Sequence, residues 1–122
     1  MELPVIEAAL DLPTSATLLL ATVAGAGLGI VSGLIPGLHA NNFALLLAGL
    51  APSVPADPLV VGAAMLAAGV VHTFVDVVPA LAIGVPDADA AVTALPGHRL
   101  VLEGRGREAM RLSALGSVLA VA

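Results

Sequence analysis

Residues 60–85 read VVGAAMLAAGVVHTFVDVVPALAIGV, and this stretch decides the fold. It contains no Lys, Arg or Glu, and at about 1.5 Å per residue a helix of this length crosses the roughly 30 Å hydrocarbon core of a bilayer. His72, Asp76 and Pro79 lie near its middle. Because polar groups are unfavourable in hydrocarbon, a membrane span that contains them usually uses them. The stretch therefore predicts a membrane protein, and transport is the first function to consider.

The composition of the whole chain also favours a membrane protein. Of its 122 residues, 59% are hydrophobic and 11% are charged, with a mean hydropathy of +1.08, whereas soluble domains carry roughly 25% charged residues. The aromatic belt of many membrane proteins is absent, since the chain has two Phe and no Trp or Tyr. The lack of Cys excludes disulfides, thiolate zinc sites and a Cys nucleophile. We expect membrane lipid as a partner, no nucleic acid and no cofactor.

Apolar and polar stretches alternate along the chain. We expect, in order, a leader at 1–13, a helix with a polar break at 14–51, a broken helix at 59–95, a basic segment at 99–111 that forms a cytoplasmic loop or an interfacial helix, and the start of a further helix at 112–122. Because that last helix has only begun, we expect the chain to be the N-terminal part of a larger protein. All four arginines lie in 99–111, and positive charge near span ends marks the cytoplasmic side.

Small residues mark one face of the first apolar helix. Gly25, Gly29 and Gly33 are spaced by four, which places them on one side of a helix and forms two overlapping GxxxG motifs. This spacing predicts the close approach of a second helix. The alternative is that glycine is simply frequent in membrane helices.

Two breaks that contain Pro interrupt the apolar runs, at 36–42 and 86–89. Each precedes a helix restart, where free N–H groups and a partial positive charge attract carboxylates. Paired interrupted helices are typical of secondary-transporter binding sites, although the same pattern also forms plain turns outside the membrane. The candidate substrate-binding residues in these breaks are Pro36, Gly37, His39, Asn41, Asn42 and Pro86. For Asp87 and Asp89 we favour N-capping.

His72 and Asp76 are candidates for ion coupling. They are four residues apart, so they share a helix face, and Asp and His within a span can relay protons or bind a cation. The alternative is a buried polar pair that bonds to a neighbouring helix. A rival of another class adds His39 to this pair as a three-ligand zinc site of an intramembrane metalloenzyme. No HExxH motif supports that rival, and we predict no catalytic residue and no metal site.

Three stretches carry motifs that resemble a known family: GLIPGL at 33–38, ALAIGVP at 80–86 followed by AAVTALPGHRL at 90–100, and the segment 105–116. They are similar to the Pro-Gly-Leu-Gly segment, the Ile-Pro-Gly and Thr-Ala-Leu-Asp-Gly-Tyr-Pro segments and the Gly-x-x-x-x-Ala-Leu region of the large permease subunit of tripartite tricarboxylate transporters, the TctA family. The similarity covers most of 25–122. His39 stands where the family usually has Gly, and Pro96-Gly97-His98 replaces Asp-Gly-Tyr, which indicates a divergent, archaeal branch.

The resemblance implies an all-α, polytopic membrane protein with broken or re-entrant helices, in the cytoplasmic membrane of a prokaryote. It implies a permease, not an enzyme, that moves di- or tricarboxylates or related organic anions with a gradient of protons or sodium. It also implies a small membrane subunit and an extracytoplasmic binding protein as partners, and it adds Thr93 to the substrate-binding candidates. A structural membrane subunit without a substrate path is the remaining alternative.

Overall fold

The computed structural model describes residues 12–84 and 91–121, and the side chains of 14–84 and 94–120. These residues form helices, and no strand lies among them. The elements are α2 (Leu12–Gly33), α3 (Ala40–Leu50), the short 3-10 helix η1 (Ala51–Ser53), α4 (Pro58–Val75), α5 (Val77–Ile83), α6 (Ala91–Leu102) and α7 (Gly106–Val121). The all-helical prediction is confirmed for this part of the chain. The second predicted break, at 86–89, lies outside the described residues.

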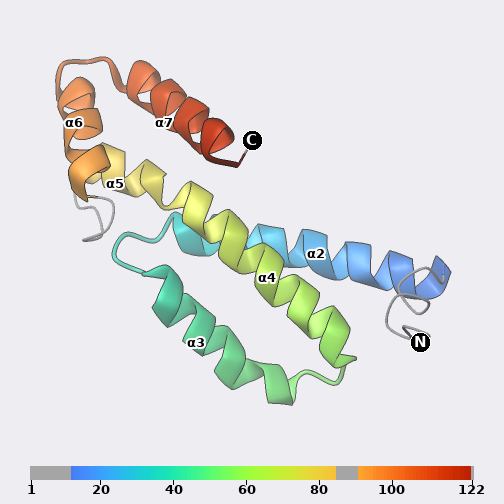
Figure 1. The fold of residues 1–122 in the computed structure, drawn as a ribbon. Coiled ribbons are helices and arrows are strands. Elements are labelled where there is room, and N and C mark those ends of the chain that lie inside the picture. Colours follow the sequence, from blue (N-terminus) through green and yellow to red (C-terminus); the bar gives the residue numbers. More distant parts are fainter. Residues whose placement is uncertain (1–11, 85–90, 122) are drawn as a thin grey trace.

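The helices form two groups that meet near the junction of α4 and α5 (Figure 1). In the first group α4 crosses α2, and α3 lies against α4. In the second group α5, α6 and α7 contact one another. The turn between α2 and α3 approaches this junction in Figure 1, so the first predicted break comes close to the middle of the chain's longest apolar stretch.

Glycine packing joins α2 to α4. A Cβ added to Gly25 would overlap the backbone carbonyl of Ala64, and one added to Gly29 would overlap the carbonyl of Ala68. Gly33 makes the same approach one turn later, close to the backbone at the end of α4. The GxxxG prediction is therefore confirmed, because these helices lie closer than any side chain on the glycines would allow.

Two helical stretches are long and apolar enough to cross a membrane by length and composition. They are Thr14–Gly33, with 20 residues, and Pro58–Ile83, with 26 residues. Large apolar side chains on both stay exposed: Leu20 and Leu66 each keep 71% of their surface accessible. The core helix of a soluble protein would bury such side chains. These faces are instead suited to lipid or to further helices.

The longer span is interrupted at Asp76, whereas the sequence predicted a continuous helix up to the break at 86–89. Asp76 lies between the two helices: its N donates to His72 O at 2.9 Å, and its O accepts from Ala80 N at 3.3 Å. Pro79 explains the interruption, because it has no N–H and its ring crowds the carbonyl four residues earlier. The sequence analysis named Pro79 near the middle of the span but did not place a break there.

In the group formed by α5, α6 and α7, the observed helix boundaries differ from the predicted ones. We expected the helix to end around Pro96, but α6 continues through it to Leu102. The close packing of Gly97 against α5 explains why the helix tolerates Pro96. A Cβ on Gly97 would overlap the side chain of Leu81 on α5. This contact belongs to a small core that α5, α6 and α7 share, formed by Ala80, Leu81, Ala94 and Ala109. Packing against this core offsets the hydrogen bond that proline removes.

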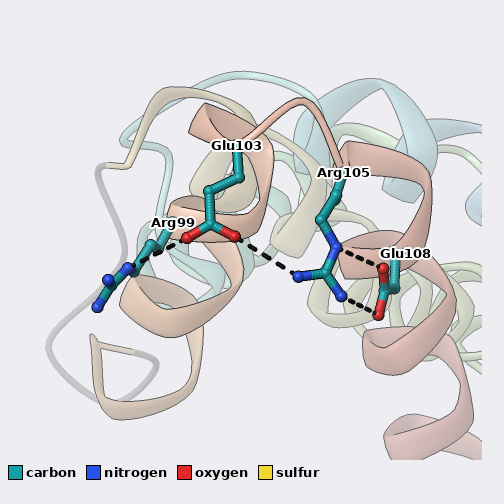
Figure 2. A network of polar contacts seen from close by, with 4 residues as sticks. All are labelled: Arg99, Glu103, Arg105 and Glu108. Atoms are coloured by element: carbon teal, nitrogen blue, oxygen red, sulfur yellow. Dashed lines mark hydrogen bonds and ion pairs between the residues drawn. The ribbon is translucent and has the colours of Figure 1, made fainter.

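Most of the basic segment 99–111, which was predicted as a loop or an interfacial helix, is helical. It comprises the last turn of α6, a turn at 103–105 and the first turns of α7. Figure 2 shows an exposed ion-pair chain across this turn, from Arg99 through Glu103 and Arg105 to Glu108, with distances of 3.3, 3.5 and 2.7 Å. Its hydrogen bond to Glu108 raises the pKa of Arg105. Because these side chains are solvated, their ion pairs contribute little to the stability of the fold. They mark a polar end of the molecule.

Candidate functional site

A cavity of about 670 Å³ lies where the two groups of helices meet. Its wall comes from the turn after α2 (35–38), the α4–α5 junction (73, 74, 76 and 77), α5 (79–81), α6 (94, 96, 97 and 100) and α7 (109, 112, 113, 116, 117 and 120). The volume falls within the range of about 300–1,000 Å³ that small-molecule sites occupy. A mainly apolar wall with a few polar groups is also typical of such sites.

Three predicted site residues line this cavity: Pro36, Gly37 and Asp76. Gly37 has a φ of 80°, in the left-handed region that favours glycine, so the turn at the cavity wall depends on its missing side chain. The structure thus brings the first predicted break and the acidic residue of the long span to one cavity. Sequence reasoning had paired that break with residues 86–89, which lie outside the described residues.

Further polar groups line the cavity from α4 and α7. Thr73 does so while its Oγ1 donates to Gly69 O at 3.0 Å. Ser113 and Ser117 come from α7, four residues apart and therefore on one face of that helix. The sequence analysis did not select these serines. A signal was present in the sequence, because Ser113, Gly116 and Ser117 are small or polar residues within the apolar second half of the helix.

The remaining substrate-binding candidates do not line the cavity or cannot be placed. His39, Asn41 and Asn42 are exposed around the start of α3, with His39 at its N-cap position in an extended conformation. Pro86 lies outside the described residues. Thr93 lies on α6, but its side chain is outside the described part of the chain. These five residues stay predictions.

His72 lies in a different environment from Asp76. It is fully buried, its Nδ1 lies 2.9 Å from Ser32 Oγ on α2, and its ring stacks on Phe43 of α3 at 5.1 Å. Ser32 Oγ in turn donates to Gly29 O at 3.2 Å, so Nδ1 is the donor to Ser32 in this arrangement. His72 Nε2 is buried without a hydrogen-bond partner in the described structure. His72 therefore connects α4, on which it lies, to α2 and α3. This role is close to the alternative in the sequence analysis, a buried polar group that bonds to a neighbouring helix.

The rival metalloenzyme is not favoured. Within the described residues, no three His, Cys, Asp or Glu side chains are grouped so that they could hold a metal ion. His39 is exposed while His72 is committed to Ser32, so the three proposed ligands do not assemble.

The comparisons with known proteins agree with the resemblance. Residues 19–122 match the tripartite tricarboxylate transporter TctA family. An uncharacterized protein, MJ1079, of the archaeon Methanocaldococcus jannaschii is 38% identical over 106 residues, which cover 84% of this chain and 25% of that protein. The chain thus spans about a quarter of the relative's length. No solved structure matches it. Because the family match covers most of the chain, this protein belongs to the tripartite tricarboxylate transporter TctA family.

Proposed function

We propose that this chain forms part of a multi-pass permease in a prokaryotic cell membrane, which moves di- or tricarboxylates or related organic anions with an ion gradient. Family membership supports the class of transporter. The observation that carries the proposal is the cavity between the first break and the α4–α5 junction. Cavities at interrupted helices are where secondary transporters hold their substrates.

The turn after α2 is the proposed substrate side of the cavity. Pro36 and Gly37 line it, and the short turn leads directly into α3. Backbone groups in such a turn can approach an anion closely, because no side chain on Gly37 intervenes. The wider set of proposed substrate-binding residues is Pro36, Gly37, His39, Asn41, Asn42, Pro86 and Thr93.

Asp76 is the proposed coupling residue. Asp76 lines the same cavity, and an ionised carboxylate there would repel a carboxylate substrate. A cation or proton that neutralises Asp76 would remove this repulsion, so that ion and substrate bind together. His72 is the second proposed coupling residue, and its Nδ1 lies 2.9 Å from Ser32 Oγ.

Two protein partners and lipid belong to this proposal. A tripartite transporter requires components besides this subunit, which we propose to be a small membrane subunit and an extracytoplasmic binding protein. Lipid is the proposed partner of the exposed apolar faces of α2 and α4.

The experiment is uptake of labelled citrate and succinate into vesicles that contain the full-length protein, with and without imposed proton or sodium gradients. We expect gradient-dependent uptake. If no carboxylate is taken up when the partner subunits are supplied, the transport proposal fails. The alternative of a structural membrane subunit without a substrate path then remains.

A labelling experiment tests the cavity itself. The chain has no cysteine, so a single Ser113→Cys variant reports on the cavity alone. We expect citrate to slow its reaction with a small thiol reagent. Arg107→Cys, on the same helix but outside the cavity wall, is the matched control and should react equally with and without citrate. Equal protection of both thiols, or of neither, would contradict a substrate site in this cavity.

A further inference from the structure

An open groove of about 410 Å³ lies between α5, α6 and α7, and it shares no wall residue with the cavity described above. Its wall is formed by Ala82 of α5, Val101 of α6, and Gly106, Arg107, Met110 and Arg111 of α7. The exposed surface of this wall is almost wholly apolar, so the two arginines line it with their aliphatic stems. Their guanidinium groups therefore lie at the rim of the groove.

Arg107 and Arg111 are the arginines of the basic segment that lack an acidic partner. The segment 99–111 has four arginines and two glutamates, which leaves an excess of two positive charges. Figure 2 shows that both glutamates are engaged by Arg99 and Arg105. Within the described residues, no acidic side chain pairs with Arg107 or Arg111. The excess positive charge of the segment thus lies at the rim of the apolar groove.

This combination of charge and apolar surface matches the chemistry of a phospholipid. Arg107 and Arg111 are four residues apart, so they are neighbours on one face of α7, and guanidinium groups bind phosphate through paired N–H donors. The apolar groove beside them suits an acyl chain. Basic pockets between membrane helices bind anionic lipid headgroups in this way. An anionic headgroup fits better than a choline headgroup, because choline would bring a further positive charge to the two arginines.

We propose that the groove between α5, α6 and α7 binds one anionic phospholipid. Arg107 and Arg111 hold its phosphate, and an acyl chain lies against Ala82, Val101 and Met110. The inference requires that the chain lies in a membrane, but it does not depend on which substrate is transported. Because the lipid contacts all three helices, its binding stabilises their packing against one another.

The test measures lipid binding without transport. Purified full-length protein in a neutral detergent is titrated with phosphatidylglycerol, phosphatidylcholine or glycerol phosphate, and binding is followed by native mass spectrometry and by thermal unfolding. We expect saturable binding of phosphatidylglycerol, at least about fivefold tighter than that of phosphatidylcholine, and a rise in the unfolding temperature. Glycerol phosphate has the anionic phosphate but no acyl chain for the groove, so it should bind far more weakly.

Two double variants with the same loss of charge test the headgroup contact. Arg107→Gln with Arg111→Gln should lower the affinity for phosphatidylglycerol by roughly thirtyfold, about fivefold for each arginine. The matched control is Arg99→Gln with Arg105→Gln, which removes two arginines that are already paired with glutamates. It should change the affinity by less than about twofold. All four side chains are exposed, so both variants should fold.

A second pair of variants tests the acyl-chain contact. Ala82→Phe places a ring in the groove and should weaken binding of phosphatidylglycerol while both arginines remain. Ala114→Phe, at an exposed position of α7 outside both cavity walls, is the matched control and should bind normally.

Four outcomes would overturn the inference. They are equal affinity for phosphatidylglycerol and phosphatidylcholine, equal losses in the two arginine variants, equal binding by the two phenylalanine variants, and binding of glycerol phosphate as tight as that of phosphatidylglycerol. The last outcome would make the groove a site for free anions. Each of them leaves the proposed transport function intact, because uptake is measured separately.

Discussion

At the scale of single residues, the approach of α2 to α4 depends on which glycine faces which helix. Gly29 faces the carbonyl of Ala68, whereas Gly27 has nothing within 4 Å of an added Cβ. The two glycines are two residues apart on one helix, so a comparison between them separates packing from helix propensity.

We predict that Gly29→Ala destabilises the protein by about 1–3 kcal/mol, because a methyl group that meets backbone cannot be relieved by a side-chain rotation. Gly27→Ala should be neutral or stabilise by up to about 1 kcal/mol, because alanine is the better helix former. Thermal unfolding in detergent, followed by circular dichroism, measures both. Equal effects of the two substitutions would contradict the packing described for α2 and α4.

His72 allows a second comparison at this scale. We predict that His72→Gln destabilises the protein by about 1–3 kcal/mol, since it disturbs the bond to Ser32 and the stacking on Phe43. Thermal unfolding in detergent measures the loss of stability, and the pH profile of uptake by the folded variant reports on ion coupling. A shifted pH optimum with unchanged stability would instead support the proton relay that the sequence suggested.

At the scale of elements, the end of α5 is fixed by α6. Gly84 ends α5 with a φ of 74°, and His98 Nδ1 donates to Leu81 O at 2.7 Å, which satisfies one of the carbonyls that a helix end leaves open. The His98 ring also occupies the space where a side chain on Gly84 would lie. The sequence alone did not indicate this capping contact of His98.

We predict that His98→Ala destabilises the protein by about 1 kcal/mol, through loss of this hydrogen bond, and loosens α6 against α5. Arg99→Ala, the next residue, should have no measurable effect, because its bond to Glu103 is exposed. Hydrogen exchange of the amides of α5 and α6 reports the loosening. Faster exchange in both variants alike would argue against a specific role for His98.

At the scale of the whole molecule, the arginines are confined to one segment, whereas exposed apolar side chains occur in both groups of helices. Every arginine lies in 99–111, and the exposed apolar side chains of α2 and α4 lie in the other group of helices. The ion-pair chain in Figure 2 places the polar turn between α6 and α7 at one end of a helical pair. Such a turn is suited to water beside a membrane.

We predict that this turn faces the cytoplasm. A reporter that is active only in the cytoplasm, fused after Arg107, should give signal, because basic residues near span ends are retained on that side. The control is the same fusion after the arginines at 105 and 107 are replaced by Gln, which should weaken the orientation. Activity of a periplasmic reporter at the same site would overturn the assignment.

The sequence by itself determined the helical class, the membrane-length stretches and the glycine face of α2. Each follows from local composition and from the 3.6-residue period, which neighbouring residues alone fix. The motifs were enough to indicate the family. The same local information placed Asp76 inside an apolar span, where a carboxylate needs a special environment.

Only the tertiary structure decided how these parts combine. It put Asp76 beside Pro36 and Gly37, placed His72 against Ser32 and Phe43, and added Ser113 and Ser117 to the cavity wall. It also kept α6 helical through Pro96, since packing against α5 outweighs the local preference of proline. These outcomes depend on contacts between residues up to about 80 positions apart in the printed sequence, and long-range packing of this kind overrides local propensity without leaving a periodic signal.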